Sequence, residues 1–257
     1  MTENPYKTII HDNICIHYFE AVSSTMDIAR NMSRSNCPNN TVIIATHQHS
    51  GRGRMQRQWQ SDCGGLYMTW VVRPQLNAKY CFAYTFTAAL AIVHTLDQLF
   101  NITAQVKWPN DVLINTQKIA GILTETQCEN NQFSFLNIGI GINVNNQVKS
   151  DTLHAISVQD LVHTHVDLDS FIQPLCNNLS NHFRNIRVDH VLKSWKVHNC
   201  TLGKMVRIVL IDRIIDGCAV DINQEGALII ALGNGQLETV TYGDCIVPGF
   251  KISSHEQ

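Results

Sequence analysis

The pattern of hydrophobic and polar positions divides the first 100 residues into short strands and two helices. Apolar runs at 14–20, 41–46 and 66–72 are rich in β-branched and aromatic residues, which is typical of strands. Residues 81–100 repeat apolar side chains at helical spacing, so the pattern predicts a helix with one buried face. We expect that face to consist of Phe82, Phe86, Leu90, Val93, Leu96 and Phe100.

A shorter helix is predicted between the first two strands, in the stretch SSTMDIARNMSRS. Ser24 or Thr25 is a suitable N-cap, and Asp27 suits the positive end of the helix dipole. The apolar side of this helix is formed by Met26, Ala29 and Met32.

Three strands follow in the middle of the chain. VLIN and KIAGILTET are separated by a short polar turn, which predicts a hairpin. In FLNIGIGINVN, apolar residues alternate strictly with small or polar ones. A face of glycine and asparagine indicates either a bulge or close backbone crossing, or a floor beneath a flat ligand. The sequence leaves both open. That face consists of Asn137, Gly139, Gly141 and Asn143.

The last third of the chain changes from helical to strand character. Residues 169–187 predict a helix with Pro174 in its first turn, where proline is tolerated. A shorter helix is expected at 190–196, and short β runs with turn signals follow it, which predicts a small barrel. We therefore expect two domains, 1–198 and 199–257.

Composition narrows the function classes. The chain is 44% hydrophobic and 16% charged, which favours a globular core over disorder, and its net charge of -2 argues against nucleic-acid binding through bulk charge. Nine dispersed cysteines without a CxxC pair are typical of a reducing compartment. No leader or membrane span is evident, so a cytoplasmic location without membrane association is expected.

The stretch SGRGRMQRQW, residues 50–59, combines flexible glycines with permanently charged arginines. Glycine lets a loop approach a ligand closely, and guanidinium groups bind carboxylates or phosphates. The pattern favours a mobile clamp for an anionic small molecule. A solvated surface loop and an RNA contact are the alternatives.

A second chemical motif is VKWPNDVLINTQKIAGIL, residues 106–123. Asn110 and Asp111 fall where a loop enters a strand, and Asp111 is a candidate Mg²⁺ ligand because that ion prefers oxygen. An Asx turn is the alternative for this pair. Lys118 is at the start of the returning strand. It is either a charge at the strand edge or, if a site lies over this hairpin, a cation held on a rigid element near the substrates.

These motifs together resemble the biotin protein ligases. SSTM, Q-x-x-GRGR with a tryptophan beyond it, KWPND, KIAGIL and GIGIN stand in the order found in that family, and the resemblance runs from about residue 18 to the C-terminus. It implies an α+β fold: a mixed β-sheet catalytic domain with helices packed on it, of the class II synthetase-like biotin-lipoate ligase type. A small C-terminal SH3-like β-barrel completes the implied fold.

The resemblance also implies an ATP-dependent reaction in two steps, with Mg²⁺. Biotin and ATP give biotinyl-5'-AMP and pyrophosphate, and biotin is then transferred to a lysine of a biotin carboxyl carrier protein, as in acetyl-CoA carboxylase. Positive groups are required because two anions meet in the first step. The loop at 51–54 would close over the intermediate and exclude water.

The resemblance assigns roles to individual residues. Lys118, Arg54 and Asp111 are the implied catalytic residues, with Asp111 acting through Mg²⁺ or on the incoming lysine. The implied biotin-binding residues are Ser24, Thr25, Gln48, Gly51, Arg52, Gly53, Arg54, Lys118, Gly139 and Gly141. The implied nucleotide-binding residues are Arg54, Trp59, Asn110, Lys118 and Asn143.

Two departures from the family pattern affect these expectations. Met26 replaces the asparagine that many relatives have after Ser-Thr, and MQRQ after GRGR contains less glycine than some relatives. The motifs begin by residue 24, so we expect no N-terminal DNA-binding domain and no repressor function. Exposed strand edges of the central sheet are a place where two protomers could pair, so a homodimer is an expectation to test. A lipoate ligase, an RNA-binding protein and a biotin binder without catalysis are the rival hypotheses.

Overall fold

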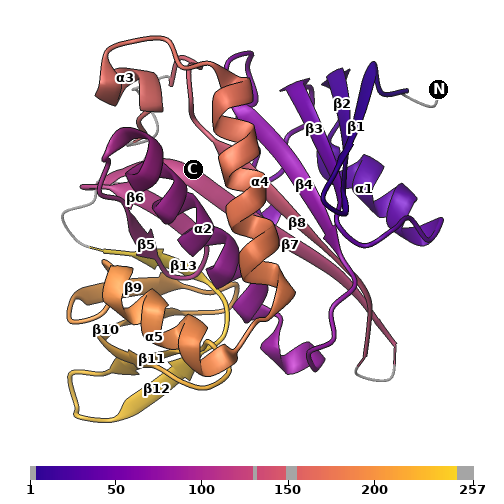
Figure 1. Cartoon of the computed structure of the whole chain (residues 1–257). Helices are drawn as coiled ribbons and strands as arrows, with labels where there is room; N and C mark the ends of the chain where they lie inside the picture. The colour runs from indigo at the N-terminus through magenta and orange to yellow at the C-terminus, as the bar shows by residue number, and fades with distance from the viewer. Residues whose placement is uncertain (1–3, 130–131, 149–154, 248–257) are drawn as a thin grey trace.

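The computed structural model describes residues 4–129, 132–148 and 155–247. Its larger sheet has eight strands in the order β1-β2-β3-β4-β8-β7-β6-β5. β2 and β3 pair in parallel and the other neighbours are antiparallel, so the sheet is mixed (Figure 1). The strands are β1 (Lys7–His11), β2 (Ile14–Val22), β3 (Thr41–Gln48), β4 (Leu66–Val72), β5 (Gln105–Lys107), β6 (Asp111–Ile114), β7 (Gln117–Glu129) and β8 (Gln132–Ile142).

The three N-terminal strands predicted from sequence are β2, β3 and β4, and the predicted hairpin is β6–β7. β1 and β5 were missed. β1 has mostly exposed side chains and β5 has three residues, so neither produces a clear period-2 pattern.

Helix α1 (Thr25–Arg34) begins as the sequence predicts. The Ser24 hydroxyl accepts a hydrogen bond from the Met26 N–H at 3.3 Å, and Asp27 lies in the first turn. Met26 and Ala29 are buried against the sheet, so the predicted apolar side is confirmed there.

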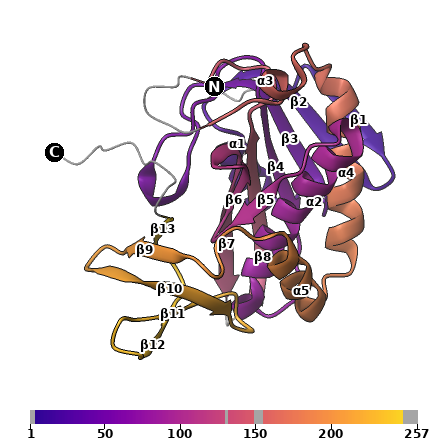
Figure 2. The ribbon, with the colours of Figure 1, turned by 90° about the vertical axis from the view of Figure 1, so that its left-hand side faces the viewer.

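In helix α2 (Phe82–Phe100) the predicted face is buried at Phe86, Leu90, Val93 and Leu96, but burial extends almost all round the helix, so the predicted face was too narrow. The helix lies between the sheet and two outer helices, α4 (Leu168–Arg184) and α5 (Val188–His198), which cover its other side (Figures 1 and 2). Phe86 stacks on Trp195 of α5, with the ring centroids 4.8 Å apart. The alanine-rich surface of α2 therefore packs against the sheet on one side and against α4 and α5 on the other.

The expected position of Pro174 was also wrong. α4 begins at Leu168, so Pro174 lies in the second turn rather than the first. Proline has no N–H, so the carbonyl of Ser170 lacks its helical donor. The helix is retained because Phe171, Leu175 and Leu179 are buried on its inner side.

Replacing Pro174 with Ala is expected to raise the free energy of unfolding by about 2–2.6 kcal/mol. Alanine restores the missing N–H, and a proline inside a helix costs about 3 kcal/mol relative to alanine. Part of that gain is offset because proline also restricts the unfolded chain, by about 0.4–1 kcal/mol. Urea denaturation of the two proteins checks this, and a less stable variant would contradict it.

The second sheet is antiparallel and has five strands in the order β12-β11-β10-β9-β13. The indole N–H of Trp108 donates to the Gly226 carbonyl at 3.1 Å, which ties this sheet to the larger one. The expected fold class is confirmed, whereas the limits 1–198 and 199–257 stay predictions. The strands are β9 (Met205–Val209), β10 (Ile214–Ile222), β11 (Leu228–Ala231), β12 (Leu237–Val240) and β13 (Asp244–Ile246).

Three short helices complete the described chain: η1 (Arg54–Gln56), η2 (Ala78–Tyr80) and α3 (Val158–Val162). None of the helices in the described ranges is long and apolar enough to cross a membrane.

Candidate functional site

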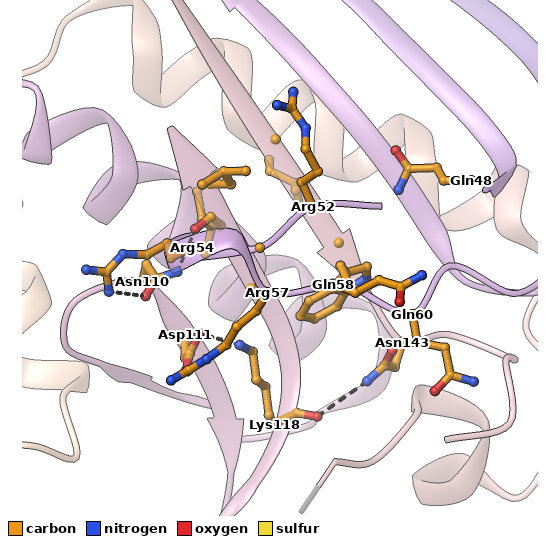
Figure 3. Close-up of a pocket in the computed structure, with 18 of the residues that line it drawn as sticks. Gln48, Arg52, Arg54, Arg57, Gln58, Gln60, Asn110, Asp111, Lys118 and Asn143 are labelled. Carbon is orange, nitrogen blue, oxygen red and sulfur yellow. Dashed lines mark hydrogen bonds and ion pairs between the residues drawn. The ribbon is translucent and has the colours of Figure 1, made fainter. Parts of the chain in front are cut away.

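A cavity of about 200 Å³ lies over β7 and β8, bounded by the start of α1, the loop after β3 and the turn into β6 (Figure 3). All the site residues predicted from sequence line it, except Gly51. Those that line it are Ser24, Thr25, Gln48, Arg52, Gly53, Arg54, Trp59, Asn110, Asp111, Lys118, Gly139, Gly141 and Asn143.

One wall of the cavity is a continuous chain of hydrogen bonds. The Thr69 hydroxyl donates to the Thr25 hydroxyl at 2.8 Å, and Thr25 donates its N–H and hydroxyl to Gln48 Oε1 at 2.9 and 3.1 Å. Gln48 Nε2 donates to Ser61 at 2.8 Å, and the Ser61 hydroxyl donates to the Trp59 carbonyl at 3.1 Å. This chain fixes the Gln48 amide, so the wall is preorganised for a polar ligand.

Gly51 lies directly behind this wall. A Cβ there would lie 2.4 Å from Ser61 Oγ and 2.5 Å from the Trp59 carbonyl oxygen. Glycine is therefore required for the loop to pack closely on the wall, and Gly51 shapes the cavity without lining it.

The glycine face of β8 is a close crossing of side chains and also the floor of the cavity. A Cβ at Gly139 would lie 2.7 Å from the sulfur of Met26, and one at Gly141 would lie 2.5 Å from the Trp59 indole. Gly121 of β7 lies under the same indole. The groups that cross this face are thus the side chains of Met26 and Trp59 and not a second backbone, and the ligand above it stays a prediction.

The arginine loop, defined as residues 51–58, folds back on itself. Arg52 forms an antiparallel bridge with Gln58, and the Gly53 N–H donates to the Arg57 carbonyl at 2.7 Å. At its tip, Met55 and Gln56 have φ values of 52° and 60°. Residues other than glycine are strained in this left-handed conformation. The segment MQRQ has Met and Gln at these two positions, so the backbone at the tip of the loop is strained.

The loop reaches the C-terminal sheet through two arginines. Arg54 Nη1 donates to Asn110 Oδ1 at 3.2 Å (Figure 3). The same nitrogen donates to the Gly243 carbonyl at 3.3 Å, and Arg57 pairs with Asp244. Burial lowers the pKa of Arg54, and the carboxylates of Asp244 and Asp111 oppose this effect. A partly desolvated guanidinium therefore lies beside the cavity.

Lys118 and Asp111 form an ion pair on the rigid β6–β7 hairpin, with Lys118 Nζ 2.6 Å from Asp111 Oδ1 (Figure 3). The ammonium lies 5.1 Å from the centroid of the Trp59 ring. Asn143 Nδ2 donates to the Lys118 carbonyl at 3.4 Å, and Asn110 Nδ2 donates to the Ile122 carbonyl at 2.7 Å. A cation, a carboxylate and an aromatic ring thus meet in one corner of the cavity.

The described residues contain no group of three or more His, Cys, Asp or Glu side chains arranged to hold a metal ion. Asp111 does offer one oxygen, because its buried Oδ1 faces Lys118 as an ion pair but forms no hydrogen bond. A single carboxylate fits Mg²⁺ that is held mainly by substrate phosphates and water.

Several residues that line the cavity were not predicted. Gly121 lies inside KIAGIL, and its close contact with Trp59 depends on a loop whose path the sequence does not give. Asp244 lies in the other sheet, so no local pattern links it to the loop. The further lining residues include Arg57, Gln58, Gln60, Met68 and Asn146.

Comparisons with known proteins agree with this geometry. The model of the "Biotin/lipoate A/B protein ligase family" matches residues 18–145, and that of the "Biotin protein ligase C terminal domain" matches residues 201–247. The "Bifunctional ligase/repressor BirA" of Bacillus subtilis is 32% identical over 226 residues, which cover 85% of this chain and 70% of that protein.

A shorter match is the "Biotin--[acetyl-CoA-carboxylase] ligase" of Paracoccus denitrificans, which is 38% identical over 40% of this chain and 43% of its own. Among solved structures, the biotin protein ligase from Aquifex aeolicus in complex with biotin and ATP superimposes with a TM-score of 0.76. It is 22% identical and covers 92% of this chain and 99% of its own, so it supports the fold. The chain belongs to the biotin/lipoate A/B protein ligase family.

Proposed function

We propose that this chain is an ATP-dependent biotin protein ligase that forms biotinyl-5'-AMP and transfers biotin to a lysine of a carrier protein. One observation carries the proposal: a single cavity is lined by the polar wall at Gln48, by the glycine floor and by the Lys118–Asp111 ion pair. The arginine loop borders the same cavity. Relatives named as biotin--[acetyl-CoA-carboxylase] ligases support the choice of acid.

In the first step, a carboxylate oxygen of biotin attacks the α-phosphorus of ATP, and pyrophosphate leaves with the electrons of the broken P–O bond. Lys118 and Arg54 border the same cavity and would offset the repulsion between the two anions. The polar wall at Thr25 and Gln48 would bind the urea head of biotin. Trp59 and Asn143 would contact the nucleotide.

In the second step, the carrier's lysine amine attacks the acyl carbon of the mixed anhydride, and AMP leaves. The amine must lose a proton, and Asp111 supplies a carboxylate at this end of the cavity. The arginine loop would exclude water, because hydrolysis of the anhydride competes with transfer. Mg²⁺ would accompany the ATP phosphates, with Asp111 as its protein ligand.

The carrier and the location follow from this chemistry. We infer that the acceptor is the biotin carboxyl carrier protein of acetyl-CoA carboxylase or of a related carboxylase, as the name of the Paracoccus denitrificans relative suggests. Free thiols at described positions such as Cys15, Cys63 and Cys176 support a reducing, cytoplasmic location. The absence of DNA binding and the homodimer stay predictions, checked by gel shift and by sedimentation.

Transfer to a purified carrier domain tests the proposal. With biotin, ATP and Mg²⁺, we expect the intact mass of the carrier to increase by one biotin joined in an amide. A carrier whose acceptor lysine is replaced by Arg should stay unmodified. A wild-type carrier that stays unmodified beside folded enzyme would contradict the proposed transfer.

A further inference from the structure

Two arginines and two carboxylates form a closed ring of ion pairs beside the cavity. Arg52 Nη2 lies 2.9 Å from Asp27 Oδ1, and Arg52 Nη1 lies 3.2 Å from Glu125 Oε1. Arg30 joins the same two acids, at 3.0 Å from Asp27 and 2.6 Å from Glu125. The four charges cancel, so each carboxylate remains paired on both sides.

The ring joins three segments that are far apart in sequence. Asp27 and Arg30 belong to α1, Glu125 belongs to β7, and Arg52 belongs to the arginine loop. α1 also begins at Thr25, which bonds to Gln48 in the polar wall. The helix that forms one side of the proposed biotin site therefore also holds the loop that closes it.

Arg52 lies at the neck of the arginine loop. It forms the bridge to Gln58, and immediately beyond that pair the Trp59 N–H donates to the Gly51 carbonyl at 2.9 Å. Because both strands of the neck are bonded to each other, holding Arg52 also holds the returning strand. Arg54 and Arg57 attach the far end to the C-terminal sheet. At the near end, the Ser50 N–H donates to the Ser23 carbonyl at 2.9 Å just before the loop, and the ion-pair ring attaches the loop itself through Arg52.

The attachment to Asp27 is electrostatic. Arg52 Nη2 is buried and makes no hydrogen bond among the described residues, although it lies 2.9 Å from the Asp27 carboxylate. The four side chains are 27–38% exposed, so dissolved ions screen the attraction in part. The strain at Met55 and Gln56 opposes closure, so the loop depends on such attachments.

We propose that Asp27, assisted by Glu125, is a positioning residue that holds the arginine loop closed through Arg52. The inference deepens the proposed function and rests on it only for the ligand that the closed loop protects. Asp27 does not line the cavity and acts through Arg52. Its loss would open the neck, admit water and let the acyl-adenylate leave.

Amide hydrogen exchange of the ligand-free protein tests the attachment without any assumption about the reaction. In Asp27→Asn, the amides of Gly53 and Trp59 are expected to exchange about 2- to 5-fold faster, because the partly exposed ion pair between Asp27 and Arg52 is lost. Amides in the middle of α1 should not change. Asp27→Glu should restore most of the protection.

Salt and a matched ion pair supply the controls. Raising NaCl to roughly 0.5 M should accelerate exchange in the wild type and should have less effect in Asp27→Asn, because screening removes the same attraction. Asp189→Asn removes an acid paired with Arg187 elsewhere on the surface and should leave the loop unchanged. Unchanged Gly53 and Trp59 exchange in Asp27→Asn would overturn the inference.

A second measurement links the attachment to the reaction. Enzyme carrying labelled biotinyl-5'-AMP, diluted into excess unlabelled biotin, should lose the label about 2- to 5-fold faster in Asp27→Asn than in the wild type. Equal loss in both would contradict the inference. Failure of the wild type to form the adenylate would contradict the proposed function instead, and the exchange experiment would still test Asp27.

Discussion

Replacing Lys118 with Ala is expected to lower the rate of biotinyl-5'-AMP formation by about 100- to 1,000-fold, the usual effect of removing one group that stabilises transition-state charge. Its ammonium is fixed by Asp111 at 2.6 Å on a rigid hairpin and faces the cavity where two anions would meet. Single-turnover formation of the adenylate, measured with saturating biotin and ATP, checks this.

Three comparisons separate catalysis from stability in the Lys118 variant. Thermal unfolding shows whether the protein stays folded once Asp111 has lost its ion-pair partner. Lys118→Arg keeps the charge in a different shape and should recover part of the rate. Lys193→Ala changes an exposed lysine of α5 and should leave the rate unchanged. An unchanged rate in folded Lys118→Ala would remove its proposed role.

Replacing Gly141 with Ala should raise the KM for ATP at least about tenfold. The new Cβ would lie 2.5 Å from Trp59 Cε2 and Nε1, so the whole indole must move. The Trp59 backbone is bonded to Gly51 and Ser61, and this limits how the ring can be accommodated. A misplaced ring removes the stacking surface proposed for the nucleotide, while the wall at Gln48 remains.

Two other glycines provide matched controls for this prediction. Gly139→Ala would meet the flexible end of Met26 at 2.7 Å, so a smaller effect is expected, mainly on the KM for biotin. Gly233→Ala meets no atom within 4 Å and should behave as the wild type. Equal ATP kinetics in Gly141→Ala and Gly233→Ala would contradict the position given to Trp59.

Local patterns predicted the elements whose signals lie in a few adjacent residues. The alternation around Ile138 and Ile140 identified β8, and the Ser24 cap identified α1, because these signals depend on adjacent residues. α2 was predicted with too narrow a buried face because α4 and α5 cover its outer side, and helical spacing does not show what packs there. Pro174 was misplaced because tertiary burial maintains a helix through a residue that local propensity disfavours.

In the candidate site, too, local motifs were predictive and contacts between distant segments were not. The sequence motifs correctly placed Gln48, Lys118 and Gly141 in one cavity. Each of these residues lies within a short motif whose residue types already indicate its chemical role. The partners of the arginine loop were not predictable. Asp244 and Glu125 are joined to it only through the arrangement of the strands, and isolated acidic residues carry no sequence signal for that role.

Exchange of labelled pyrophosphate into ATP, with Mg²⁺ and either biotin or lipoate, tests the central claim most directly. Exchange reports reversal of the first step, so it needs no carrier protein. Exchange that depends on biotin and is absent with lipoate is the predicted result. Exchange with lipoate alone would assign the chain to lipoate chemistry, and no exchange with either acid from folded protein would contradict the account.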